Sequence, residues 1–141
     1  MARAAAEKTT RINRETFAPV NIQRYCRGLN TWPRSWMGME EDIAPGERLI
    51  ECFRPFLESL AASGKSHRAI QEHVDNMWAL GGEFITELNY DPPLRKRPVD
   101  RVLRDLIRYG GPLLRDADEE QQASFDSTCE MFRRFLGNTA P

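Results

Sequence analysis

The residues best suited to chemistry are basic side chains concentrated between residues 95 and 108. Four arginines in this stretch follow one another at steps of four, three and four residues: Arg97, Arg101, Arg104 and Arg108. At 100° per residue, this spacing places their guanidinium groups in one stripe along a helix, opposite its apolar face. Such a row could contact successive phosphates or an acidic protein surface. The alternative is a solvated face, because Asp100 and Asp105 could pair with the arginines along the helix.

The basic stripe could extend in both directions along the chain. Lys96 adds positive charge at its start, and Lys65 and Arg68 lie at the start of the helix expected before it. A helix N-terminus itself favours anions. The leading interpretation is a non-catalytic helical module that binds nucleic acid, with duplex DNA as the favoured partner. Its predicted contact residues are Lys65, Arg68, Lys96, Arg97, Arg101, Arg104 and Arg108.

Other residues that could serve catalysis lack the context that catalysis needs. Residues 59–66 end like a phosphate-binding loop, but Ser59 replaces the first glycine and the preceding segment is predicted to be helical. His67 and His73 are six positions apart, so they do not face one metal ion as an i, i+4 pair would. We therefore predict that the protein is not an enzyme and needs no cofactor or metal.

The cysteines and the hydropathy indicate a cellular setting. The three cysteines are odd in number and far apart, which argues against a disulfide framework and favours the cytoplasm. Cys26 lies between Arg24 and Arg27, and neighbouring cations could lower the pKa of its thiol, but we expect a bystander thiol. No apolar run approaches the roughly 20 residues that span a bilayer, so we predict no membrane partner.

The elements that must position these residues are helices. The chain has 141 residues, 40% hydrophobic and 29% charged, which is typical of one soluble globular domain. Apolar residues recur at helical spacing in four segments, and no strand pattern of comparable strength appears. The sequence therefore predicts an all-α fold, a compact bundle of four to five helices. The helices are expected over residues 45–63, 67–89, 98–109 and from 116 or 118 to a stop at Gly137.

Two of the expected helices contain residues that normally break a helix. Pro55 should kink the first helix or split it in two. Gly81 and Gly82 lie inside the second, where they cost roughly 2 kcal/mol relative to alanine. We expect the second helix to continue through them, with a break at the pair as the alternative. A continuous helix would let the glycines admit a close neighbour, such as a tryptophan of the N-terminal segment.

Residues 1–44 are predicted to form a partly irregular N-terminal arm that packs on the bundle of residues 45–141. The first 15 residues are polar and are expected to fray. The indoles of Trp32 and Trp36 are costly to leave in water and should lie against the core. A second functional interpretation uses the same region as an exposed hydrophobic anchor. The chain would then be a protein–protein adaptor, a homo-oligomer or a small subunit of a larger bacterial assembly, anchored through Trp32, Trp36, Met37 and Met39.

Charge is segregated along the chain, although the formal net charge is only −1. Residues 1–34 hold seven basic and two acidic side chains, whereas residues 38–60 hold six acidic and two basic ones. The near-neutral total therefore hides patches of both signs. Such an arrangement suits a protein that docks a partner with one face and repels it with another.

Residues 49–88 resemble the helical core-binding domain of tyrosine recombinases and integrases. The residues that carry the resemblance are Phe53, Phe56, Leu57, Leu60, the run Ser63-Gly64-Lys65-Ser66-His67-Arg68-Ala69-Ile70, His73, Val74, Met77, Trp78, Leu80 and Phe84. Ala69 stands where the family typically has a threonine, and the family's catalytic Arg, Lys, His-x-x-Arg and Tyr have no counterpart. The resemblance implies a DNA-clamping accessory module of a mobile element or phage, not a recombinase.

Overall fold

A computed structural model describes residues 22–139 of the chain. The described residues form five α-helices joined by short 3-10 helices, with no strand among them, which confirms the all-α prediction. The expected fraying of residues 1–15 lies outside the described part. In chain order the helices are α2 (Trp32–Trp36), α3 (Ile43–Ala61), α4 (His67–Tyr90), α5 (Val99–Leu106) and α6 (Glu119–Thr139), and the 3-10 helices are η1 (Ile22–Arg24), η2 (Leu29–Thr31), η3 (Glu40–Asp42) and η4 (Pro92–Lys96).

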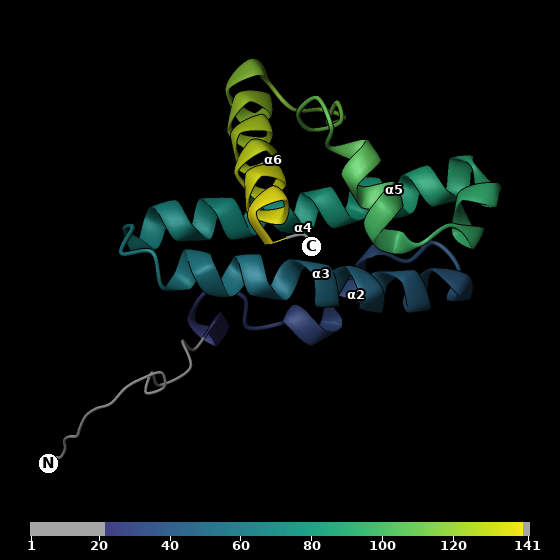
Figure 1. Ribbon diagram of the computed structural model, residues 1–141, viewed down its shortest axis with the longest axis horizontal. Helices are drawn as coiled ribbons and strands as arrows, with labels where there is room; N and C mark the ends of the chain where they lie inside the picture. Colours follow the sequence, from purple (N-terminus) through teal and green to yellow (C-terminus); the bar gives the residue numbers. More distant parts are fainter. Residues whose placement is uncertain (1–21, 140–141) are drawn as a thin grey trace, which may run out of the picture.

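The centre of the fold is the antiparallel pair of long helices α3 and α4 (Figure 1). Gly64 makes the turn between them with a φ of +83°, a conformation that only glycine adopts without strain. Ser66 then caps α4, because its hydroxyl accepts a hydrogen bond from the Ala69 N–H at 3.1 Å. The predicted start of this helix at residue 67 is therefore confirmed.

Neither central helix is divided by the helix-breaking residues that it contains. α3 begins at Ile43, two residues before its predicted start, and runs through Pro55 to Ala61 without dividing in two. Phe53 and Phe56 are buried on either side of the proline, and their packing offsets the lost backbone hydrogen bond. α4 likewise runs unbroken through its glycine pair, as predicted.

The two C-terminal helices differ from their predicted lengths. α5 is shorter than expected, because it begins only after Pro98 and ends before Ile107. α6 starts at a reciprocal cap: the Asp118 carboxylate accepts from the Gln121 N–H at 2.7 Å, and the Gln121 side chain accepts from the Asp118 N–H at 3.0 Å. The prediction that Gly137 ends this helix was wrong, since α6 continues to Thr139.

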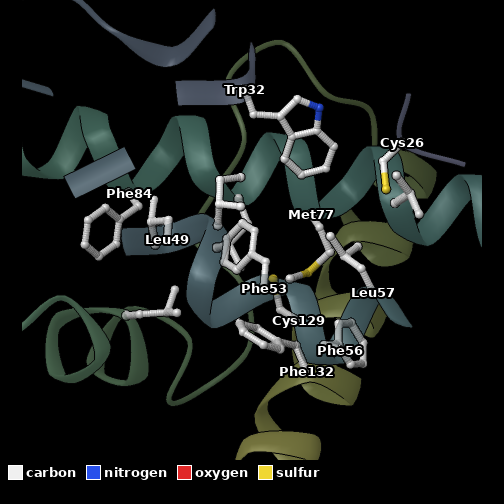
Figure 2. Packing of buried hydrophobic residues seen from close by; sticks show 14 of the residues in the cluster. Cys26, Trp32, Leu49, Phe53, Phe56, Leu57, Met77, Phe84, Cys129 and Phe132 are labelled. Carbon is white, nitrogen blue, oxygen red and sulfur yellow. The ribbon is translucent and has the colours of Figure 1, made fainter. Parts of the chain in front are cut away.

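The hydrophobic core lies where α6 crosses the α3–α4 pair (Figures 1 and 2). Phe53 of α3 meets Phe132 of α6 edge to face, with ring centroids 5.5 Å apart. Phe56 lies against the same ring at 5.1 Å. On the opposite side, residues 22–42 cover the pair with short elements. Their buried apolar side chains are Ile22, Cys26, Leu29, Trp32 and Trp36.

Trp36 fixes this N-terminal cover to α4 through Gly81. A Cβ at Gly81 would lie far closer than 3.0 Å to the Trp36 ring, so only glycine lets the indole approach the helix. The Trp36 N–H also donates to the Trp78 carbonyl at 2.9 Å. The expectation that a tryptophan of the N-terminal segment lies against the glycines is thus confirmed.

Asp42 forms the second attachment of the N-terminal cover, and its side chain is fully buried. One carboxylate oxygen accepts from the N–H groups of Gly38 at 2.7 Å and Met39 at 3.0 Å, and the other from Arg95 at 2.6 Å. Burial alone would raise the pKa of Asp42, but the hydrogen bonds from Arg95, the two N–H groups and Asn89 outweigh burial and lower it. Arg95 therefore serves the fold and is not a free surface cation.

Candidate functional site

Exposed basic side chains line α5 and its two ends, and we call this region the α5 basic surface. α5 buries Val102 and Leu103 and presents Arg101 and Arg104 to solvent on its other side. Arg97 precedes the helix and Arg108 follows it, so the predicted stripe extends beyond the helix at both ends. The surface consists of Lys96, Arg97, Arg101, Arg104 and Arg108, all exposed.

Acidic neighbours offset part of this positive charge. Asp105 lies 3.6 Å from Arg97 and 2.9 Å from Arg108, so one carboxylate is shared by two guanidinium groups. Both pairs are exposed, and exposed pairs contribute little to stability and leave the groups available. Arg101 and Arg104 have no ion pair within 4.0 Å in the described part of the chain.

Helix α3 adds a further arginine beside this surface. A shallow groove of about 300 Å³ separates the start of α3 from the start of α5, and Arg48 and Arg97 both line it. The charges of Arg48 and Arg104 both act on the half-buried thiol of Cys52. Burial raises the pKa of that thiol and Asp100 raises it further, while the two arginines oppose the rise. Arg48 itself pairs with Glu51 at 3.5 Å, so α3 adds a guanidinium group beside the α5 basic surface but no unpaired cation.

The structure does not bring Lys65 and Arg68 to the α5 basic surface. These two residues lie at the start of α4, whereas Lys96 follows its end (Figure 1). α4 has 24 residues, which correspond to about 36 Å at 1.5 Å per residue. The seven predicted contact residues therefore form two separate sites and not one continuous face.

The two histidines have no metal-binding arrangement. His73 Nδ1 lies 2.7 Å from the Thr128 hydroxyl, so this ring links α4 to α6. Burial lowers the pKa of His73, Lys65 lowers it further, and Glu72 opposes them. Among residues 22–139, no group of three His, Cys, Asp or Glu side chains could hold a metal ion.

The cysteines are buried or half-buried, and their reactivity is suppressed. Burial raises the pKa of Cys26, although Arg54 opposes the rise, which contradicts the alternative that its neighbouring arginines lower it. The Cys26 thiol donates to the Ile22 carbonyl at 3.2 Å, while its sequence neighbours Arg24 and Arg27 point to solvent. Burial raises the pKa of Cys129 to about 12.

Over the described range, no helix is long and apolar enough to cross a membrane.

The tryptophans predicted as an exposed anchor do not lie on the surface. Trp32 and Trp36 each keep only 8% of their surface exposed, which confirms their expected packing but rules them out as anchors. Met37 and Met39 do remain exposed. The exposed indole is Trp78, at 44%. The exposure of Trp78 could have been predicted from its position next to Met77. One step along a helix turns a side chain by 100°, so the neighbour of a buried residue points away from the buried face.

A groove runs along the side of α4 that contains Asp75, and we call it the α4 groove. It has a volume of about 820 Å³ and lies between α4 and the beginning of α6. Its acidic side chains outnumber its basic ones by five to two. The acidic residues are Glu72, Asp75, Glu83, Asp116 and Glu120, and the basic residues are Arg68 and Arg115.

A second, more apolar hollow of about 520 Å³ lies beside the α4 groove, next to Trp78. Asp75 and Ala79 line both spaces, so the hollow and the α4 groove adjoin across these two residues. The N-terminal cover closes the hollow with Tyr25 and Trp32. Sequence reasoning missed this combined site because its walls come from three distant parts of the chain.

Comparison of the chain with protein-family models, curated proteins and solved structures finds no match. The resemblance of residues 49–88 to the recombinase core-binding domain therefore remains an expectation.

Proposed function

We propose that this protein is a non-catalytic module that binds nucleic acid through the α5 basic surface. The observation that carries the proposal is the row of five exposed cations on α5 and its ends, of which Arg101 and Arg104 have no ion pair. Arg48 of α3 adds a guanidinium group beside the row. Guanidinium groups at such positions can each pair with two phosphate oxygens.

The size of the surface fits a phosphate backbone. α5 has eight residues, which correspond to a length of about 12 Å. Duplex DNA carries one negative charge per about 1.7 Å of its axis, so a surface of this length faces several phosphates. Contacts to phosphates position a protein without reading the sequence of the bases. We therefore expect binding that is sensitive to salt and tolerant of DNA sequence.

The cellular role follows as part of the same proposal. The resemblance of residues 49–88 and the free cysteines support an accessory DNA-binding protein of a mobile element or phage that acts in the cytoplasm. The predicted contacts from Lys65 and Arg68 are separable from the main surface, because about 36 Å of α4 lies between them. These two residues therefore provide a matched control.

Fluorescence anisotropy with a labelled mixed-sequence duplex, at low and near-physiological salt, tests the proposal. The double variant Arg101→Gln/Arg104→Gln should bind about tenfold more weakly, and the slope of log K against log salt should become shallower by about 2. The control Lys65→Gln/Arg68→Gln removes the same charge at the far end of α4. Equal losses in both variants would indicate general charge attraction, and no binding at low salt would contradict the proposal.

A protein-binding role is the second candidate, and the exposed position of Trp78 favours it. The predicted anchors Trp32 and Trp36 are buried, but an indole beside an apolar hollow is a common centre of a protein interface. An adaptor or assembly subunit would then engage its partner at α4. Trp78→Ala should weaken such a partner and leave DNA binding unchanged in the same anisotropy assay.

A further inference from the structure

We propose that the α4 groove and the hollow beside Trp78 together bind a basic segment of a partner protein that carries one apolar side chain. This inference is independent of DNA binding at the α5 basic surface. The two sites have opposite charge. The excess of acidic side chains in the α4 groove attracts a basic segment and repels phosphate.

The acidic wall of the groove is available for such a partner. No carboxylate of the groove has an arginine or lysine within 4.0 Å in the described part of the chain. Glu72 accepts a hydrogen bond from Ser124, and Asp75 accepts one from Gln71 at 3.1 Å. These neutral donors orient the two carboxylates and leave their charge uncompensated, so lysine or arginine of a partner can pair with them.

Glu83 is the position in the groove at which a partner cation should bind more strongly than at a fully exposed carboxylate. Its side chain is half-buried, and burial raises the pKa of its carboxyl; Arg115 opposes the rise and Glu87 adds to it. A partner cation seated beside Glu83 would stabilise the ionised carboxylate. Because the site is partly shielded from water, this interaction is stronger than one between fully exposed charges.

The hollow supplies a place for the apolar side chain. Tyr25, Trp32, Val74 and Trp78 form the aromatic and aliphatic part of its wall, and Arg27 and Asp75 add one charge of each sign. Trp78 is fixed there, because its indole N–H donates to the Ser35 hydroxyl at 2.9 Å. An aromatic side chain that is already immobilised loses little entropy on binding, which favours it as an anchor.

The length of the groove suits a short peptide. Its α4 wall runs from Arg68 to Glu83, a separation of 15 positions, or about 22 Å along the helix axis. An extended chain of roughly six or seven residues covers that distance. Asp75 and Ala79 lie at the boundary with the hollow, so the apolar side chain of the partner belongs near the middle of its basic segment.

Fluorescence anisotropy with designed peptides tests the inference. The probe is a labelled peptide of about eight residues in which lysine and serine alternate around one central leucine. The double variant Asp75→Asn/Glu83→Gln should bind it at least about fivefold more weakly than the unaltered chain, because two charges of the wall are lost. The matched control Glu47→Gln/Glu58→Gln removes the same charge from the exposed face of α3 and should bind normally.

The leucine tests the hollow. A peptide with serine in its place should bind more weakly to the unaltered chain, and Trp78→Ala should abolish the difference between the two peptides. Binding of the leucine peptide should also protect tryptophan fluorescence from acrylamide, since Trp78 is exposed whereas Trp32 and Trp36 are buried. Equal binding of both peptides to the unaltered chain would overturn the proposed role of the hollow.

Three further outcomes would overturn the inference. The first is no peptide binding at low salt, and the second is an equal loss in the α3 control. The third is self-association in sedimentation velocity that Asp75→Asn/Glu83→Gln abolishes, because a second copy would then occupy the groove. The variant Arg101→Gln/Arg104→Gln distinguishes peptide binding from the proposed DNA binding. It should weaken DNA binding and leave peptide binding unchanged. Circular dichroism confirms that each variant is folded.

Discussion

The α3–α4 pair is covered on two sides, and the two covers are attached in different ways. On one side, residues 22–42 form elements of no more than five residues, and their specific contacts include Trp36 at Gly81 and Asp42 at Arg95. On the other side, the 21-residue helix α6 buries a row of apolar side chains and adds hydrogen bonds from α4 at its edge. Short elements bury little surface each, so single contacts carry more of their stability.

This difference has a functional consequence, because both covers build the proposed peptide site. The N-terminal cover supplies Tyr25 and Trp32 to the apolar hollow, and α6 supplies Glu120 and Ser124 to the acidic groove. Loss of either cover should therefore remove one half of the site. Substitutions that break each attachment separately show how unequal the two covers are.

The largest effect is expected at Arg95 in the N-terminal cover. Arg95→Met leaves the buried Asp42 carboxylate without its cation and should lower the free energy of unfolding by about 3 kcal/mol. Arg97→Met is the matched control, because that arginine is exposed and shares Asp105; it should cost less than about 0.5 kcal/mol. Urea unfolding followed by circular dichroism measures both. Similar small costs for the two variants would contradict a specific role for Asp42.

The next largest effect is expected at Gly81. Gly81→Ala forces its new methyl group into the Trp36 ring and should cost about 2 to 3 kcal/mol, in spite of the better helix propensity of alanine. Gly82→Ala is the matched control, since its Cβ would lie 3.7 Å from Trp36. That change should be neutral or stabilise by up to about 1 kcal/mol. Thermal unfolding compares the pair, and equal effects would mean that the indole is not held against the helix.

A smaller effect is expected from one polar contact of α6. Thr128→Val removes a buried hydroxyl that accepts from Asn76 at 2.9 Å and meets His73 at 2.7 Å. The cost should be about 1 kcal/mol, because the apolar row of α6 remains intact. Ser127→Ala, at an exposed position of the same helix, serves as control in urea unfolding. A cost equal to that of Arg95→Met would show that α6 also depends on a single contact.

Helical periodicity and caps predicted much of the fold, because these signals are local. Helix α4 begins at the predicted residue, and it continues through Gly81 and Gly82 as predicted. The end of α6 was not predicted, and the sequence left open whether Pro55 kinks α3 or divides it, since packing against distant residues outweighs local propensity at both places. The contact between Trp36 and Gly81 was anticipated because a glycine inside a long helix needs a packing reason.

The candidate sites were predicted less completely, because each depends on residues that are distant in sequence. The arginines of α5 are close along the chain, and their shared exposed surface was therefore recognisable. Arg95 looked equivalent to them, yet it pairs with Asp42, which lies 53 positions away. The α4 groove and the adjoining hollow together combine α4, α6 and the N-terminal cover, and no local pattern indicates that combination.

The smallest effect is expected from pH, which should act on the two covers in different ranges. His73 has a pKa below its ordinary value of 6.5, so the unfolded chain binds more protons than the folded one just below pH 6.5. Stability from this contact is present above about pH 6.5 and falls as the pH decreases towards the folded pKa. Asp42 has a pKa below 3.8, so its stabilising contribution persists until the pH falls below about 4.

Hydrogen exchange measured segment by segment, and corrected for the intrinsic effect of pH, separates these two responses. Protection of α6 should decrease between about pH 7 and 5.5, while residues 22–42 keep theirs over the same range. His73→Gln should remove the response of α6, because the substituted side chain does not titrate. If both covers lose protection together and His73→Gln changes nothing, the attachment of α6 does not depend on the protonation of His73. The two covers would then behave as one cooperative unit, and their different contacts would affect stability but not local opening.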